Sequence, residues 1–181
     1  MDLIKFGEYI GRLKGLNRTG WIRYGVPNPE SVAEHSFRTT IFAMVLSKEY
    51  GQDQLKAIKL ALIDDIGEAI IGDVVAEKGG EVNNAVLKRK LLQERKAVQR
   101  IFSLVGYNEA VSLFDELEAN TTAEAKLVRQ IDRLEMVLQA KEYEDKYKLD
   151  LEEFYQSGFA RIKDKKLIKI LEKLYSARQK R

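Results

Sequence analysis

Residues 60–73, which read LALIDDIGEAIIGD, constrain the fold and the chemistry of this chain more than any other segment. The apolar residues predict a buried helix, yet its middle carries three carboxylates, those of Asp64, Asp65 and Glu68. Burying an ionised carboxylate costs several kcal/mol even after relaxation, so acids in such a run are usually paired, protonated or bound to a metal ion. Residues three and four positions apart share one face of a helix, so we expect the three side chains to point to one patch of a site.

The composition is typical of a helical globular protein. The chain has 181 residues, of which 45% are hydrophobic and 33% charged, and it contains only two prolines. This length is sufficient for one packed core, so we expect residues 1–181 to form a single domain. The net charge is +3, and the basic residues alternate with acidic ones along helical segments, which does not indicate binding to a nucleic acid polymer.

No segment predicts secretion or insertion into a membrane. The first fifteen residues, MDLIKFGEYIGRLKG, carry charges throughout, and no run approaches the roughly 18 apolar residues of a membrane span. The chain has no cysteine, which excludes a disulfide framework and thiolate chemistry and suits a reducing compartment. We therefore expect a cytoplasmic protein without a membrane partner.

Apolar spacing and capping signals predict a series of helices and no convincing strand. Ser31 and Glu34 form a capping-box signature at the start of a helix that runs to about residue 50. Its expected buried stripe consists of Phe37, Ile41, Met44, Val45 and Leu46. The other helices are expected at residues 2–14, 53–71, 85–105, 107–118, 121–147, 151–161 and 164–178. The fold class is therefore an all-α bundle, with a loop at residues 76–84 of the kind that can act as a mobile lid.

Three residues outside the acidic run are also candidates for a site. Trp21, the only tryptophan, lies in the glycine-bearing loop after the first predicted helix and either packs as a core-covering aromatic or binds a ligand. Arg18 lies in the same loop and would, by itself, be interpreted as a surface arginine. His35, the only histidine, lies in the first turn of a helix, where a lone histidine is more often structural than functional. The capping box nevertheless fixes the start of that helix and hence the direction of the imidazole.

Potential metal ligands occur on three of the predicted helices, and they are His35, Asp64, Asp65 and Asp132. Facing helices of a bundle supply metal ligands in this way. Spacing alone does not show that these side chains converge. The alternative is a network of ion pairs, for which Arg38 and Arg133 are available partners.

Four sequence blocks stand out along the chain: RTGW at 18–21, PESVAEHS at 29–36, ALIDDIGEAIIGD at 61–73 and QIDRLEMVLQAKEYE at 130–144. In their residues and their order they resemble the 5′-deoxynucleotidase branch of the HD-domain metal-dependent phosphohydrolases. The resemblance implies an all-helical HD fold, a divalent metal ion and a homodimer. It also implies hydrolysis of deoxynucleoside 5′-monophosphates to deoxynucleoside and phosphate.

The resemblance assigns metal binding to His35, Asp65 and Asp132. The motif that names the superfamily has a histidine where this chain has Asp64, so an Asp–Asp pair replaces the expected His–Asp pair. An aspartate oxygen also binds divalent ions, and three carboxylates with one imidazole favour hard cations, so the expected cofactor is Mn²⁺, Co²⁺ or Mg²⁺. Because aspartate is shorter than histidine, Asp64 could also fail to reach the ion and leave a site with three protein ligands, or an empty one.

The resemblance also assigns catalytic and substrate-binding roles. Glu68 and Asp73 match acidic residues proposed to transfer protons and to position the attacking water. Arg18 and Trp21 match the loop that holds the phosphate and crowds the sugar, where an aromatic wall could reject a 2′-hydroxyl.

Other functions remain open at this point. A non-catalytic HD domain that binds a nucleotide or a partner is one alternative, and Asp64 is the residue that favours it. A phosphohydrolase of the same superfamily acting on cyclic nucleotides or nucleoside triphosphates is another, although the R-x-x-W loop at 18–21 favours a monophosphate. The last alternative is a purely structural helical protein without a binding or catalytic site.

Overall fold

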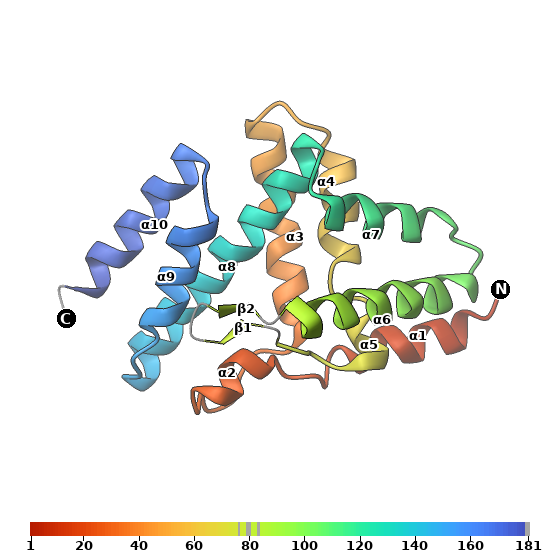
Figure 1. Cartoon of the computed structure of the whole chain (residues 1–181), viewed down its shortest axis with the longest axis horizontal. Coiled ribbons are helices and arrows are strands. Elements are labelled where there is room, and N and C mark those ends of the chain that lie inside the picture. Colours follow the sequence, from red (N-terminus) through yellow and green to blue (C-terminus); the bar gives the residue numbers. More distant parts are fainter. Residues whose placement is uncertain (76, 79–80, 83, 180–181) are drawn as a thin grey trace.

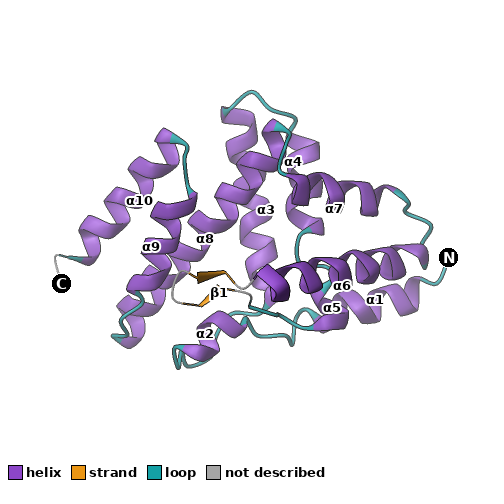
Figure 2. Cartoon of the chain, in the orientation of Figure 1, coloured by secondary structure: helices purple, strands orange, loops and turns teal. Residues whose placement is uncertain are grey.

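The computed structural model describes residues 1–75, 77–78, 81–82 and 84–179, and these are mostly helical (Figures 1 and 2). The helices are α1 (Leu3–Arg12), α2 (Thr19–Arg23), α3 (Val32–Glu49), α4 (Gln54–Ile63), α5 (Glu68–Ile71), α6 (Asn84–Ser103), α7 (Glu109–Ala119), α8 (Ala123–Tyr147), α9 (Glu152–Arg161) and α10 (Lys165–Arg178). The predicted all-α fold class is confirmed, although α2 was predicted as part of a loop.

One small hairpin interrupts the helical pattern. Its strands β1 (Glu77–Lys78) and β2 (Glu81–Val82) pair antiparallel, with Glu77 opposite Val82. The sequence predicted no strand here. Several positions of the lid expected at residues 76–84 lie outside the described residues, so the lid stays a prediction.

Helix α8 is the centre of the bundle and contacts α3, α4, α7, α9 and α10. In Figure 1 it crosses the middle of the molecule, with α9 and α10 on one side and α1, α6 and α7 on the other, so the two chain ends lie far apart. Val128, Ile131 and Ala140 of α8 are fully buried in the main core. A smaller apolar cluster under α1 includes Tyr9, Leu13 and Ile101. None of the helices in the described residues combines the length and apolar character that crossing a membrane requires.

The first turn of α3 forms as the sequence predicted. The backbone N–H of Glu34 donates to Oγ of Ser31 at 3.2 Å, and the backbone N–H of Ser31 donates to Oε2 of Glu34 at 2.7 Å. This capping box fixes the direction in which His35 leaves the helix, and the imidazole is buried.

The buried stripe predicted for α3 is wrong at Phe37, Ile41 and Val45, because the structure leaves these side chains exposed. The face that α3 buries carries smaller or polar residues, namely Val32, His35, Thr39, Ala43 and Ser47. Helices α4 and α8 pack against α3 there, and small side chains allow helix axes to approach closely. Apolar periodicity selected the face with the larger residues, which is the face toward solvent.

The predicted helix at 53–71 is also interrupted, since α4 ends at Ile63, residues 64–67 form a turn and α5 begins at Glu68. Gly67 allows the turn to approach α6, because a Cβ atom at this position would lie 2.9 Å from the Cα of Glu94. The three carboxylates therefore do not share one helical face. Asp64, Asp65 and Glu68 have different partners, as described below.

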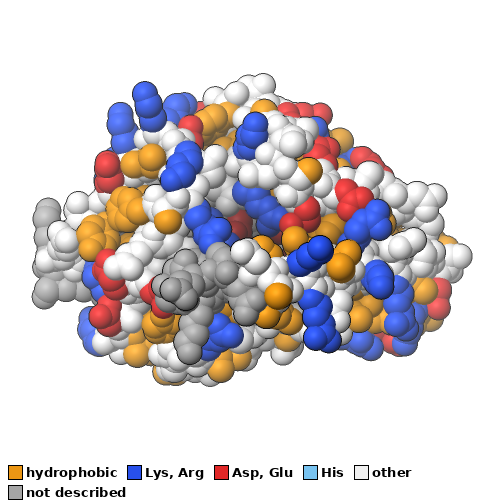
Figure 3. Space-filling view, viewed as in Figure 1, with side chains coloured by type: hydrophobic (Ala, Val, Ile, Leu, Met, Phe, Trp, Pro, Cys, Tyr) orange, Lys and Arg blue, Asp and Glu red, His pale blue; other side chains and the backbone are white. Residues whose placement is uncertain are grey.

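Lysine and arginine side chains on the face drawn in Figure 3 are distributed among acidic and uncharged groups over the whole view. They do not form one continuous basic patch on this face. The distribution agrees with the alternation of charges in the sequence.

Candidate metal and phosphate site

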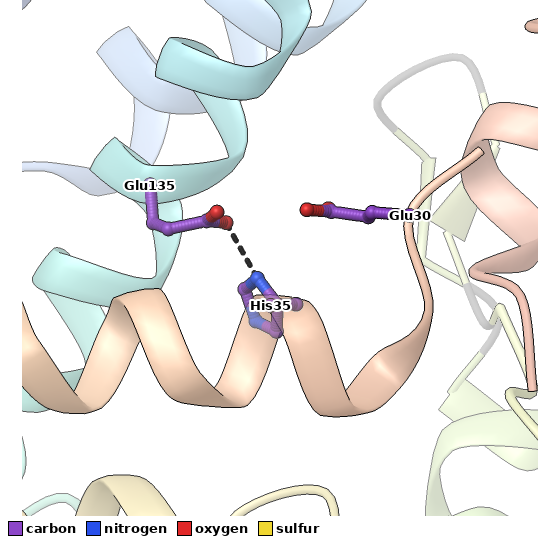
Figure 4. Close-up of side chains that lie close together, drawn as sticks. All are labelled: Glu30, His35 and Glu135. Carbon is purple, nitrogen blue, oxygen red and sulfur yellow. Dashed lines mark hydrogen bonds and ion pairs between the residues drawn. The ribbon is translucent and has the colours of Figure 1, made fainter. Parts of the chain in front are cut away.

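His35 is the centre of a buried polar network between α3 and α8 (Figure 4). Its Nδ1 lies 2.5 Å from Oε2 of Glu135. On the other side of the ring, Nε2 lies 3.0 Å from Oδ1 of Asp132 and 3.7 Å from Oδ2 of Asp65. Figure 4 shows Glu135 reaching from α8 to the imidazole and Glu30 pointing toward the same pair from the segment before α3. The structure therefore places both Asp65 and Asp132 beside Nε2 of His35.

The carboxylates around His35 favour its protonated form. Burial and the nearby Arg18 lower the pKa of His35, but hydrogen bonds with Asp132 and Glu135 outweigh them and raise this pKa to about 10. Burial raises the pKa of Asp132, yet the hydrogen bond from His35 and the nearby arginines hold it well below the usual range. The proton on Nε2 of His35 therefore occupies a position where the carboxylates of Asp132 and Asp65 stabilise a positive charge.

Among the described residues, Glu30, His35 and Glu135 alone have possible ligand atoms that all lie within 4.8 Å of one another. Two arginines, Arg18 and Arg38, already supply positive charge beside these two glutamates. Nε of Arg38 donates to Glu135 at 2.7 Å, while Nη1 of Arg18 lies 3.8 Å from Glu30 and 3.9 Å from Glu135. Because Nδ1 of His35 donates to Glu135, the contact is of the carboxylate–histidine type that leaves Nε2 free to bind a metal ion. We infer that Glu135 orients the imidazole toward the two aspartates.

Asp64, which occupies the position of the expected histidine, belongs to a separate ion-pair network. Its Oδ1 accepts a hydrogen bond from Nη1 of Arg129 at 3.2 Å, and Nη2 of Arg129 donates to Glu118. Burial raises the pKa of Asp64 to about 7, although Arg129 opposes this shift. The partners expected for the acids from the sequence were Arg38 and Arg133, and Arg129 was missed. The role of Asp64 as a fourth metal ligand stays a prediction.

Glu68 is buried against α6, where Lys90 binds it. Nζ of Lys90 lies 3.1 Å from Oε1 of Glu68 and 3.3 Å from Oε1 of Glu94. Burial and then the carboxylate of Asp65 raise the pKa of Glu68 to about 9, against the opposing effect of Lys90. Burial likewise raises the pKa of Glu94 to about 7. Lys90 and Glu94 were missed from the sequence because charges alternate along the predicted helices, and this pattern does not show which charged side chains are buried.

A cavity of about 460 Å³ lies beside this network, and its walls include Arg18, Trp21, Asp73, Lys90 and Phe154. Oδ2 of Asp73 accepts from the backbone N–H of Thr19 at 2.5 Å, and the Asp73 carbonyl oxygen accepts from Oγ1 of Thr19 at 2.8 Å. These bonds join the segment after α5 to the loop that carries Arg18. Nη1 of Arg18 is buried and has no hydrogen-bond partner among the described residues.

Trp21 packs as a core aromatic and also lines the cavity. It is 1% exposed, and its indole N–H donates to Oε1 of Glu30 at 2.9 Å. Its ring stacks on Phe154 with centroids 4.2 Å apart and meets the edge of Tyr143 at 5.2 Å. The substrate-binding role expected for Trp21 is compatible with this position and stays a prediction.

Three comparisons place this geometry among known proteins. The model of the HD domain family matches residues 10–175. The protein 5′-deoxynucleotidase HDDC2 of Homo sapiens is 34% identical over 98% of this chain and 86% of its own length. The protein of the same name from Xenopus laevis is also 34% identical, over 98% of this chain and 88% of its own length. The solved structure of a conserved hypothetical protein from Pyrococcus furiosus has a TM-score of 0.76 and 34% identity, covering 96% of this chain and 99% of that one.

Proposed function

This chain belongs to the HD domain family, and we propose that it is a metal-dependent 5′-deoxynucleotidase that hydrolyses deoxynucleoside 5′-monophosphates to deoxynucleoside and phosphate. The observation that carries the proposal is the position of Arg18 between the His35 network and the cavity. Its buried Nη1 has no hydrogen-bond partner among the described residues, so it is available to a phosphate oxygen. A guanidinium binds phosphate through two parallel hydrogen bonds, and a cavity of about 460 Å³ has the size of a small-molecule site.

The cofactor is a divalent metal ion, and the residues that would hold it are His35, Asp65 and Asp132. The types of donor fit such an ion, and Nε2 of His35 lies 3.0 and 3.7 Å from the two carboxylates. The three ligand atoms do not all lie within 4.8 Å of one another, so the two aspartates would have to move closer together around an ion. Neighbouring ligands of an octahedral ion at about 2.1 Å are themselves about 3 Å apart. When bound, the ion supplies Lewis acidity toward a phosphoryl oxygen and lowers the pKa of a water molecule toward neutrality. The oxygen-rich donors favour Mn²⁺, Mg²⁺ or Co²⁺.

Glu68 and Asp73 carry the proton transfers in this proposal. One carboxylate accepts a proton from the attacking water, and the other donates a proton to the ribose oxygen that leaves phosphorus. We assign the leaving oxygen to Asp73, because Asp73 lines the cavity next to Arg18. Glu68 is then the base, and because burial and Asp65 raise its pKa to about 9, it must lose its own proton before it accepts one from the attacking water.

The wall formed by Trp21 and Phe154 contacts the sugar in this proposal. The two rings stack on each other, so neither can move freely to admit a larger group. An aromatic surface offers no hydrogen bond to a 2′-hydroxyl. The hydroxyl of a bound ribonucleotide would therefore lose its hydrogen bonds to water without gaining others. We therefore expect a preference for deoxyribose over ribose.

The first test is phosphate release from the four deoxynucleoside 5′-monophosphates and their ribo-counterparts. Metal-stripped protein is assayed with Mn²⁺, Co²⁺, Mg²⁺ or Zn²⁺ added back one at a time. Metal-dependent release that favours the deoxy series is expected. Arg18→Ala should abolish phosphate release, and Arg18→Lys should retain only part of it. Arg95→Ala is the control, because it removes only an exposed ion pair with Asp115 and should leave phosphate release unchanged. No phosphate release from the folded protein with any of the four metal ions would contradict the proposal.

The Asp64–Arg129 ion pair favours a second candidate function, an HD domain that binds a nucleotide with little or no turnover. In this case Asp64→His should raise metal affinity and create or increase activity. Nucleotide binding by calorimetry, with cyclic nucleotides and nucleoside triphosphates included, distinguishes this candidate from a phosphohydrolase with another substrate.

We further propose that the chain forms a homodimer and that residues 1–181 are a single HD domain, in agreement with a family match that extends over residues 10–175. The substrate is a small molecule rather than a nucleic acid polymer or a membrane. The cytoplasmic location expected from the sequence remains a prediction.

A further inference from the structure

Two buried polar atoms on the walls of the 460 Å³ cavity have no hydrogen-bond partner among the described residues. They are Nη1 of Arg18 and Oγ of Ser157. The proposed function uses the first atom to bind the phosphate and leaves the second without a role. A buried hydroxyl without a partner costs free energy, so its position beside a cavity indicates a ligand that supplies the missing hydrogen bond.

Ser157 differs in this respect from serines in other helices of the chain. Ser36, Ser103 and Ser112 each donate to a backbone carbonyl three or four residues earlier, at 2.9, 2.8 and 2.8 Å. This bond within the helix is a common way to satisfy a serine hydroxyl. Ser157 lies inside α9 and makes no such bond in the described part of the chain. Its hydroxyl is therefore left for a partner outside α9.

The stacked rings of Trp21 and Phe154 connect the two atoms along the cavity wall. Their centroids are 4.2 Å apart. Arg18 precedes Trp21 by three residues at the start of α2, and Ser157 follows Phe154 by three residues in α9. Residues three apart lie on the same face of a helix, and all four line the cavity. Arg18, the ring pair and Ser157 therefore follow one another along one wall.

Helix α8 fixes this part of α9 in place, and the two helices are in contact (Figure 1). A Cβ atom at Gly158 would lie 2.8 Å from Cγ2 of Val137, so the glycine allows α9 to lie close against α8. Met136 of α8 is 7% exposed and also lines the cavity. A thioether makes favourable contacts with an aromatic ring. The wall beyond the ring pair therefore offers an apolar surface for a flat heterocycle, with the Ser157 hydroxyl beside it.

We propose that Ser157 and Met136 form the subsite for the nucleobase of the substrate, in which Oγ of Ser157 hydrogen-bonds to the edge of the base. The proposal rests on the proposed function, which assigns the phosphate to Arg18 and the deoxyribose to Trp21 and Phe154. The base is the third part of a deoxynucleotide and is attached to the sugar. With the first two parts so placed, the base extends toward Ser157.

A serine hydroxyl contacts a base without selecting one of the four. It donates one hydrogen bond, has two lone pairs and rotates, so it can donate to a carbonyl oxygen of thymine or guanine or accept from an amino group of adenine or cytosine. The hydroxyl of Tyr24, which also lines the cavity, already donates to Glu153 and is not available as a second contact. The expected substrates are therefore deoxynucleoside monophosphates of all four bases, and not sugar phosphates in general.

The test compares substrates with and without a base. Ser157→Ala should lower kcat/KM by roughly 3- to 10-fold for each of the four deoxynucleoside 5′-monophosphates, the usual effect of losing one uncharged hydrogen bond. Turnover of 2-deoxyribose 5-phosphate, which has no base, should not change. Ser112→Ala is the matched control, because its exposed hydroxyl bonds within α7 and it should match the native chain with every substrate.

Other outcomes contradict the proposal. An equal loss with 2-deoxyribose 5-phosphate would show that Ser157 supports the cavity and does not contact the base. A loss confined to one nucleotide would show that Ser157 selects a base. Unchanged kcat/KM with all four nucleotides would remove Ser157 from the subsite.

A binding measurement separates this proposal from the nucleotidase activity. Calorimetry on metal-stripped protein compares deoxythymidine 5′-monophosphate with 2-deoxyribose 5-phosphate in the absence of hydrolysis. The native chain should bind the nucleotide more tightly, and Ser157→Ala should reduce the ratio of the two affinities by roughly 3- to 10-fold. If this result holds while the metal-loaded native chain releases no phosphate, the base subsite stands and the nucleotidase is rejected. If the native chain releases phosphate but Ser157→Ala leaves the affinity ratio unchanged, only the subsite is rejected.

Discussion

Asp64 and Asp65 are neighbours in the sequence, yet they belong to different charge networks. Asp65 lies 3.7 Å from Nε2 of His35, whereas Asp64 accepts a hydrogen bond from Arg129 at 3.2 Å. The interruption of the helix at residues 64–67 separates the two side chains. The difference lies in the cation each network contains. A proton on His35 can be replaced by a metal ion, whereas the guanidinium of Arg129 keeps its charge at every working pH.

This contrast explains how the chain accommodates an aspartate at position 64, where the resemblance to the HD-domain phosphohydrolases predicts a histidine. A carboxylate at position 64 without a cation would be a buried, uncompensated charge, which typically costs several kcal/mol. Arg129 supplies that cation and is itself bound by Glu118. The residues around His35 retain their potential metal donors, whereas the carboxylate of Asp64 is engaged by an ion pair with Arg129.

The largest expected effect is a different outcome for matched substitutions in the two networks. Asp65→Asn and Asp132→Ala should each lower metal affinity by about 100-fold or more, because even groups that merely support a ligand contribute roughly 10- to 100-fold. Asp64→Asn should retain stoichiometric metal, because Asp64 is held by Arg129. Bound metal is measured after dialysis, and activity is measured as phosphate release, for each of the three variants. Equal loss of metal in Asp64→Asn and Asp65→Asn would show that Asp64 is a ligand and would break the comparison.

The second effect concerns turnover. Glu68→Gln should lower turnover by roughly 10²- to 10⁴-fold, the usual contribution of a general acid or base, while nucleotide binding changes little. The matched control is Glu118→Gln, which removes a partly buried charge from the Asp64 network and should leave turnover close to that of the native chain. Turnover and nucleotide affinity are measured separately at saturating metal. Equal losses of both in Glu68→Gln would reject the proton-transfer role.

The sequence predicted the helices and the residues around His35 better than it predicted their partners. Spacing and family blocks brought out His35, Asp65 and Asp132, because a ligand must be a particular residue type at a particular position. Arg129, Lys90 and Glu135 were missed, because charged residues on amphipathic helices give the same pattern whether they face solvent or a buried acid. Pairing between helices distant in the chain is decided by tertiary packing.

Two further errors have local causes. The periodic pattern treated residues 53–71 as one helix, since a turn that depends on Gly67 fitting against α6 has no periodic signal. On α3, the pattern favoured the large residues Phe37, Ile41 and Val45, although close packing buried Ala43 and Ser47 instead. Apolar periodicity detects that a helix has an apolar face and does not show which partner covers it.

The last effect sharpens the comparison through the pH dependence of stability. Burial raises the pKa of Asp64 to about 7 from an unfolded value near 3.8, so between these values the native chain binds a proton that the unfolded chain lacks. The contribution of Asp64 to the free energy of unfolding therefore falls as pH rises from about 4 to 7, by at most about 1.4 kcal/mol per pH unit. Asp64→Asn should lose less stability over this interval in urea unfolding. If the free energy of unfolding changes with pH equally in the native chain and in Asp64→Asn, Arg129 keeps Asp64 ionised over the whole interval.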